Sequence, residues 1–122
     1  MNNENIILKS SGKQYFSYIY STDVATALVF LMLKGKNTEA YNIADKNSNI
    51  QLKDLASLVA QDCNVEVVFD IPEETEKAGY SKSVRAILNT EKINTLGWSA
   101  KVSIEEGIKR TIKILQDRNY FF

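Results

Sequence analysis

The pattern of apolar and polar positions predicts short strands and helices that alternate along the chain. Its least interrupted apolar run is 24–33, where every residue except Thr26 is apolar. This run predicts a helix capped near Asp23 and ended at Gly35. It is too short for a bilayer, which needs about 20 apolar residues. A helix that is apolar on all sides is normally surrounded by other parts of the protein, so this helix is predicted to lie in a core.

Short strands are predicted on both sides of this helix. Residues 14–21 are rich in aromatic and β-branched types, and 18–23 lead into the helix as a strand. Alternation along a strand places Phe16, Tyr18 and Tyr20 on one face. After the turn that follows Gly35, residues 39–45 are predicted to form a second strand, with 40–44 as its interior. A further short strand is predicted at 6–9.

The second half of the chain predicts two longer helices and a short one. Residues 52–62 repeat apolar side chains with a clear helical period, and 65–69 and 83–88 are strand candidates. Asn89 is suited to cap a short helix through Leu96, with Gly97 in a left-handed conformation after it and Trp98 folded onto the core.

Ser103 and Glu106 have the spacing of a capping box, which predicts the start of the last helix. Its apolar face is formed by Ile104, Ile108, Thr111, Ile112 and Leu115. With 122 residues in all, the chain is predicted to be a single α/β domain with short strands and three to four helices.

Composition excludes several classes of function. Fifteen basic and fifteen acidic residues balance, so no charge excess indicates nucleic acid or an anionic membrane as a partner. The chain has no histidine, and its one cysteine is Cys63, so no imidazole-based or disulfide chemistry is predicted. The acidic cluster 73–76 is interpreted as the first turn of a short helix rather than a metal site. Because its polar start has no signal-like apolar region, the protein is expected to be cytoplasmic.

Two groups of motifs resemble one family of enzymes. The first is Tyr-Ile-Tyr-x-x-Asp-Val-Ala-x-Ala-Leu from Tyr18, followed by Glu-Ala-Tyr-Asn-Ile-Ala from Glu39. The second begins at Arg85 and continues through Leu-Gly-Trp at 96–98 and Ser-x-Glu-Glu-Gly at 103–107. Their order and spacing resemble the C-terminal part of the extended short-chain dehydrogenase/reductases, the NAD(P)-dependent epimerases and dehydratases of nucleotide sugars.

The resemblance implies a substrate-binding role for three residues. By this resemblance, Tyr18 would line the nucleotide-sugar site. Arg85 would reach the substrate phosphate with its forked guanidinium group. Phe16 occupies the position where the family has a phosphate-binding arginine, and a phenyl ring offers no charged donor. Simple packing of the aromatic residues, and an exposed or ion-paired Arg85, are the structural alternatives. A UDP-linked or dTDP-linked sugar is the expected ligand.

The family's cofactor and catalytic motifs are missing from this sequence. Its five glycines are too scattered to form the glycine-rich loop that binds NAD or NADP. No tyrosine is followed four positions later by the lysine that the family uses in proton transfer. Residues 1–122 are therefore expected to be the substrate-binding fragment of a Rossmann-type enzyme without its cofactor half. No catalytic, cofactor-binding or metal-binding residue is assigned, and the fragment is expected to be inactive alone.

The missing cofactor half also has consequences for the surface of this chain. Without a cofactor domain, the helix over 24–33 and the strand 40–44 would be left uncovered, which predicts self-association or binding to the missing half. The alternatives are an interaction module without a ligand, and a truncated gene product or excised piece without an independent role. Which sugar nucleotide is bound, and whether the reaction is epimerisation, dehydration or decarboxylation, stays open.

Overall fold

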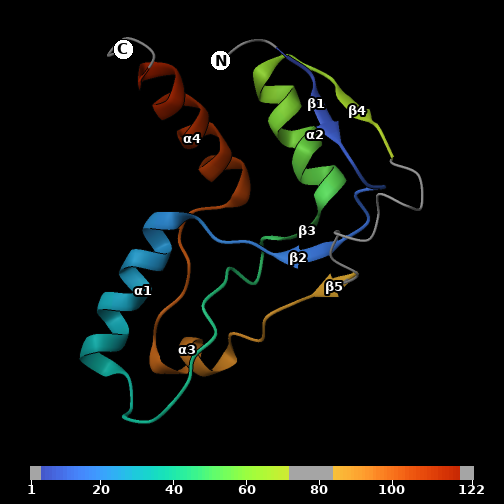
Figure 1. Cartoon of the computed structure of the whole chain (residues 1–122). Coiled ribbons are helices and arrows are strands. Elements are labelled where there is room, and N and C mark those ends of the chain that lie inside the picture. The colour runs from blue at the N-terminus through green and yellow to red at the C-terminus, as the bar shows by residue number, and fades with distance from the viewer. Residues whose placement is uncertain (1–3, 72–83, 119–122) are drawn as a thin grey trace.

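The computed structural model describes residues 4–71 and 84–118 (Figure 1). These residues form four helices and five short strands, which confirms the predicted α/β class with short strands and three to four helices. The helices are α1 (Ser21–Lys34), α2 (Leu52–Cys63), α3 (Glu91–Leu96) and α4 (Ile104–Arg118). The strands are β1 (Ile6–Leu8), β2 (Tyr15–Ser17), β3 (Asn49–Gln51), β4 (Val67–Phe69) and β5 (Arg85–Ala86).

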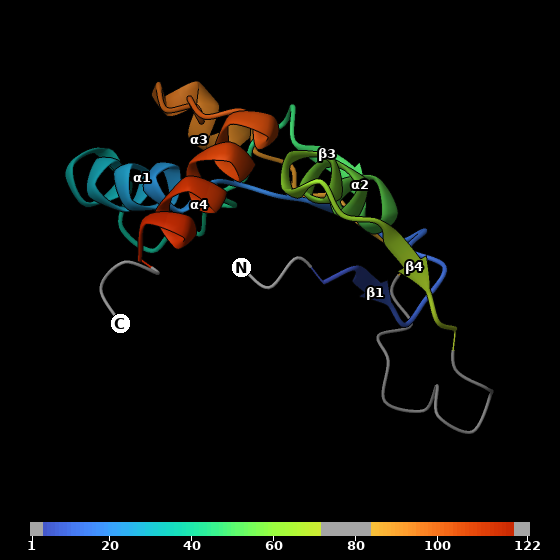
Figure 2. The same ribbon diagram turned by 90° about the horizontal axis from the view of Figure 1, so that it is seen from above.

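The strands form two small sheets. β1 pairs with β4 in parallel, and β2 is the central strand of a three-stranded sheet of order β3-β2-β5. β2 runs antiparallel to β3 and parallel to β5. In Figure 1 this sheet crosses the middle of the molecule, with α2 and the β1–β4 pair above it and α3 below it. Seen from above, α1, α3 and α4 gather at one end, and α2 with β1 and β4 lies at the other (Figure 2).

A small core joins α1 to α3 and to the residues that follow α3. It is formed by Ala27, Ile93 and Trp98, which are all buried. The Trp98 indole N–H donates to Thr26 Oγ1 at 3.2 Å, so the ring is also fixed to α1. Gly97 ends α3 with a φ of 109°, a left-handed conformation that favours glycine. The predictions for Gly97 and Trp98 are confirmed.

The predicted start of α1 was wrong in two respects. The strand before it covers only 15–17, and the helix begins at Ser21 with Tyr20 as its N-cap residue. Asp23 therefore lies in the first turn and does not cap the helix. Its carboxylate is buried and accepts the backbone N–H groups of Lys101 and Val102, both at 2.9 Å. The sequence pattern predicted that the Asp23 side chain would cap its own helix. Its carboxylate instead binds the backbone of residues 101 and 102, far along the chain.

The predicted strand at 39–45 is also absent, because the described part of the chain offers this segment no neighbouring strand. It runs without a helix, turn or bend, and Asp45 N–H donates to Tyr18 O at 3.2 Å. The outer face of α1 is open rather than covered: Met32 is 85% exposed and Leu33 76%. The described residues therefore leave this face of α1 uncovered, as the sequence predicts for the chain without a cofactor domain.

The other helix boundaries follow the sequence closely. α2 and α4 form where the apolar periods indicate, and Glu106 N–H donates to Ser103 Oγ at 3.3 Å, as a capping residue requires. Asn89 Oδ1 accepts the Glu91 N–H at 2.8 Å, so its side chain does support the start of α3. The predicted acidic helical turn at 73–76 lies outside the described residues. No helix in the ranges 4–71 and 84–118 is long and apolar enough to cross a membrane.

Candidate functional site

Strand register separates two of the predicted site residues. Arg85 and Gln51 are the partners of Tyr15 on either side of β2, whereas Ala86 and Ile50 are the partners of Phe16. Directly paired residues project to the same face of a sheet, and successive residues project to opposite faces. Arg85 therefore shares a face with Tyr15, and Phe16 lies on the other face.

The ring of Tyr15 supports the Arg85 guanidinium group. The guanidinium carbon lies 5.8 Å from the ring centroid, within the range of a cation–π contact. The Tyr15 N–H also donates to Val84 O at 2.9 Å, which fixes the backbone just before Arg85. Arg85 itself is exposed, so its donors face solvent while its orientation is restricted. An exposed, oriented guanidinium group is suited to bind a phosphate.

A short hydrogen-bond relay holds the three strands together beside this pair. The Ser17 hydroxyl donates to Asn49 Oδ1 at 2.7 Å and accepts the Leu88 N–H at 3.0 Å. Ser17 thereby joins β2 to β3 and to the segment that follows β5. The relay fixes the relative position of the strands that carry Arg85 and Tyr15.

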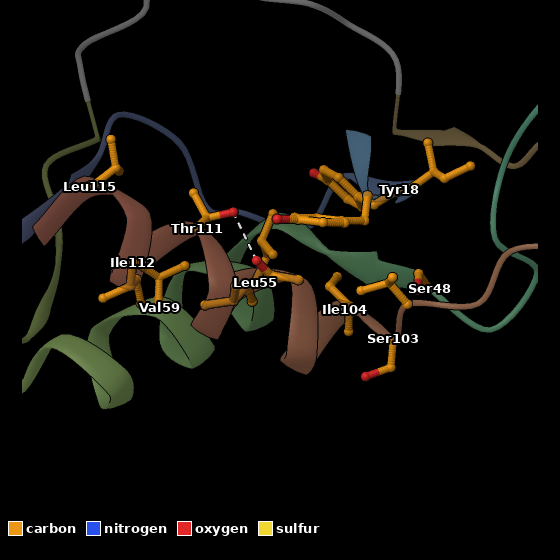
Figure 3. A pocket seen from close by; sticks show the side chains of 14 residues that line it. Tyr18, Ser48, Leu55, Val59, Ser103, Ile104, Thr111, Ile112 and Leu115 are labelled. Atoms are coloured by element: carbon orange, nitrogen blue, oxygen red, sulfur yellow. Dashed lines mark hydrogen bonds between the residues drawn. The ribbon is translucent and has the colours of Figure 1, made fainter. Parts of the chain in front are cut away.

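Tyr18 lies in a different place, at one end of an apolar groove between α2 and α4 (Figure 3). The groove encloses about 280 Å³. Its lining includes Leu55 and Val59 from α2 and Ile104, Ile108 and Leu115 from α4. The predicted apolar face of the last helix thus forms one wall of the groove.

The groove is suited to apolar groups rather than to ions. The Thr111 hydroxyl donates to Gly107 O at 2.8 Å, and the Ser48 hydroxyl donates to the Asp45 carboxylate, so both are used within the chain. Burial raises the pKa of the Tyr18 hydroxyl above its ordinary value of 10.0, because the ionised form would lose hydration there. The titratable side chains in the described lining are the two tyrosines, Tyr18 and Tyr20, so no acid–base pair is formed there.

The structure does not bring the three predicted residues into one site. Tyr18 lines the groove, Arg85 stacks on Tyr15, and Phe16 lies on the sheet face opposite Arg85. Their substrate-binding roles stay predictions. Sequence analysis missed Tyr15 as the support of Arg85, because the pairing of β2 with β5 joins residues 70 positions apart. The aromatic character of 14–21 was the one available signal.

The described glycines do not fit an NAD-binding loop. Gly35 and Gly97 end helices, and Gly107 lies inside α4 against Tyr20. Gly12 lies between β1 and β2 rather than between a strand and a helix. In the part of the chain that the structure describes, no group of three or more His, Cys, Asp or Glu side chains could hold a metal ion.

Solved structures define the class of fold. Over 94% of its length, the chain superposes on 36% of the UDP-glucose 4-epimerase of Thermotoga maritima, solved with UDP-glucose, with a TM-score of 0.80 and 28% identity. The dTDP-glucose 4,6-dehydratase of Bacillus anthracis, solved with NAD, gives a TM-score of 0.81 at 18% identity, over 98% of this chain and 36% of that one. The fold is that of Rossmann-type epimerases and dehydratases.

Sequence comparison adds the family. Residues 1–44 match the model of the NAD dependent epimerase/dehydratase family. Human dTDP-D-glucose 4,6-dehydratase is 34% identical over 114 residues, which cover 91% of this chain and 32% of that protein. The resemblance found in the motifs is therefore confirmed, and the chain is related to this family. It spans about a third of the length of the curated relatives it matches.

Proposed function

We propose that the chain is the nucleotide-sugar-binding, C-terminal portion of an NAD(P)-dependent epimerase or dehydratase. The observation that carries this proposal is the exposed Arg85 guanidinium group, oriented by the ring of Tyr15. Arg85 also begins the second group of family motifs. Two of the relatives named above support the ligand class, since one was solved with UDP-glucose and the other is a dTDP-D-glucose dehydratase.

On this proposal, Arg85 binds the diphosphate and the cofactor-binding half comes from polypeptide outside residues 1–122. NAD or NADP would then supply the hydride chemistry, and this chain would only bind and orient the sugar nucleotide. The glycines of the described residues support this division, because none of them opens a helix directly after a strand. Cytoplasmic localisation is part of the proposal and is supported by the single, free Cys63.

Titration with UDP-glucose and dTDP-glucose, followed by NMR, tests the binding proposal. Resonances of Arg85 and Tyr15 should shift on saturation, and Arg85→Ala should weaken binding at least tenfold. Arg85→Lys should recover only part of it, because an ammonium group lacks the guanidinium fork. Arg110→Ala is the matched control, since Arg110 is exposed and paired with Glu106 on α4. Absence of shifts with both nucleotides, or an equal loss in the Arg110 variant, would contradict the proposal.

The absence of turnover is tested separately. Pure protein with NAD or NADP and either nucleotide sugar should give neither reduced cofactor nor altered sugar. Measurable turnover would refute the division of roles but would leave nucleotide binding intact.

The second candidate is a non-catalytic interaction or oligomerisation module, which includes a truncated product without activity. The open apolar face of α1 favours this candidate. It predicts no nucleotide-induced shift at Arg85, together with association that depends on α1.

A further inference from the structure

We propose that the Gln51 side chain is a second ligand-binding group of the Arg85 site. Its carboxamide oxygen accepts a hydrogen bond from an N–H or O–H group of the bound nucleotide. This inference rests on the proposed function, because it assigns a further residue to the same site.

Gln51 has a polar atom that the described part of the chain does not satisfy. Its Oε1 is buried and, within the described residues, has no hydrogen-bond partner. Gln51 is the N-cap residue of α2, but its side chain makes no capping hydrogen bond. The N–H groups of Leu52 and Lys53, which open the helix, donate instead to backbone carbonyls just before β2, both at 2.9 Å. A buried acceptor without a donor is costly, and folded proteins retain few of them.

Strand pairing brings this amide close to Tyr15. Leu52 N–H donates to Gln14 O at 2.9 Å, which makes these two residues a hydrogen-bonded pair. Because the two kinds of pair alternate along an antiparallel ladder, the next pair, Tyr15 with Gln51, is non-hydrogen-bonded. The Cα atoms of such a pair are only about 4.5 Å apart, and the two side chains lie together on one face of the sheet.

The next pair of this kind along the same face shows a satisfied amide. There the Ser17 hydroxyl donates to Asn49 Oδ1 at 2.7 Å. Tyr15 provides no such donor to the oxygen of Gln51. The unpaired oxygen is therefore a property of this one position and not of the sheet face as a whole.

Arg85, Tyr15 and Gln51 form a row across three neighbouring strands, β5, β2 and β3 (Figure 1). The two ends of the row are two strand spacings apart, about 10 Å. Arg85 offers charged donors for a phosphate, and Gln51 offers an acceptor. A nucleotide sugar carries groups for both, because its diphosphate joins a nucleoside to a sugar and each of these has N–H or O–H groups.

The amide reaches such a ligand by rotation of its own side chain. Gln51 is partly exposed, so it lies at the boundary between the interior and solvent. Water competes for the oxygen once it has turned outward. A donor of a nucleotide already held by Arg85 has the advantage, because its phosphate contact keeps it beside the amide.

Gln51→Met tests the assignment, because methionine has a side chain of similar length without the acceptor. In titrations of the full chain with UDP and UDP-glucose, binding of at least one of them should weaken about three- to tenfold. A loss confined to UDP-glucose places the donor on the sugar, and an equal loss with UDP places it on the nucleoside. The thermal midpoint of the free variant should rise by about 3–5 °C, because an apolar group replaces a buried, unpaired oxygen.

Gln14→Met is the matched control. Gln14 directly precedes Tyr15, so it projects to the opposite face, and its side-chain amide exchanges hydrogen bonds with the Ser10 hydroxyl at 3.4 Å. This variant should leave both affinities unchanged. In NMR spectra of the wild type, the side-chain amide resonances of Gln51 should shift on saturation with UDP-glucose, and those of Gln14 should not.

Unchanged affinity of Gln51→Met for both nucleotides would overturn the inference, as would a variant that is less stable than the wild type. Arg85→Ala separates this failure from that of the proposed function. If Arg85→Ala loses binding and Gln51→Met keeps it, the role of Gln51 is refuted and the proposed function stands. If the wild type binds neither nucleotide, the proposed function fails, and the role of Gln51 fails with it.

Discussion

The Asp23 carboxylate accepts the backbone N–H of Val102 at 2.9 Å, across 79 positions of the chain. The same oxygen accepts the N–H of Lys101, also at 2.9 Å. One buried side chain thus joins the first turn of α1 to the segment that leads into α4. α4 forms a wall of the groove, so this contact fixes the groove as well as the fold.

Asp23→Ala should lower the free energy of unfolding by about 1–3 kcal/mol, because two backbone donors lose their acceptor. Lys101 is exposed, so water can replace part of the loss at its N–H. Urea unfolding followed by the fluorescence of Trp98, the single tryptophan, measures the change. Asp54→Ala is the control, since Asp54 is an exposed carboxylate in the first turn of α2. An equal effect of both substitutions would show that the Asp23 contact is not specific.

Gly107→Ala should destabilise the protein by about 1–3 kcal/mol, because it inserts a methyl group into a packed contact. A Cβ at this position would lie 2.9 Å from Tyr20 Cδ2, closer than atoms normally approach. The three nearest atoms all belong to Tyr20, so the clash should depend on that ring.

A double-mutant cycle separates this clash from helix propensity. In a Tyr20→Ala background, Gly107→Ala should become neutral or stabilising, because alanine is favoured over glycine inside a helix by about 0.5–1 kcal/mol. Thermal unfolding of the four proteins gives the coupling. Destabilisation of the same size in both backgrounds would exclude Tyr20 as its cause.

The free energy of unfolding should fall at alkaline pH because of Tyr18. Burial raises the pKa of its hydroxyl in the folded protein above the ordinary value of 10.0. Above pH 10 the unfolded chain loses this proton while the folded chain keeps it, so the stabilising contribution is complete below pH 10. It is lost as pH rises from 10 through the folded pKa. Phenolate absorbance should show a late-titrating component that Tyr18→Phe removes, and this variant should also flatten the alkaline loss of stability. An unchanged titration curve in the variant would contradict the assignment.

Local rules predicted the elements whose signals lie within a few residues. Ser103 and the N–H of Glu106 are three positions apart, and Gly97 needs only its own backbone freedom to end α3. The apolar period of α2 likewise gave its boundaries within one residue, 52–62 against Leu52–Cys63. Each of these features depends on contacts along one turn of helix, so the sequence contains the whole signal.

The candidate site depended on register, which a single sequence does not specify. The expectation that Phe16 and Arg85 belong to one site came from motif order. The pairing of Arg85 with Tyr15 places Phe16 on the opposite face of the sheet. A shift of one residue in that register would reverse the result, because strand side chains alternate between faces.

By itself, the sequence determined the family, the order of the helices and the apolar character of α1, since composition and short-range periodicity are sufficient for these. Only the tertiary structure decided that Asp23 binds a distant backbone, that Arg85 rests on Tyr15, and that, within the described residues, 40–44 has no strand beside it. These features depend on which segments meet in space. Contacts between distant segments are selected by packing and hydrogen bonding over the whole chain, and no local pattern encodes them.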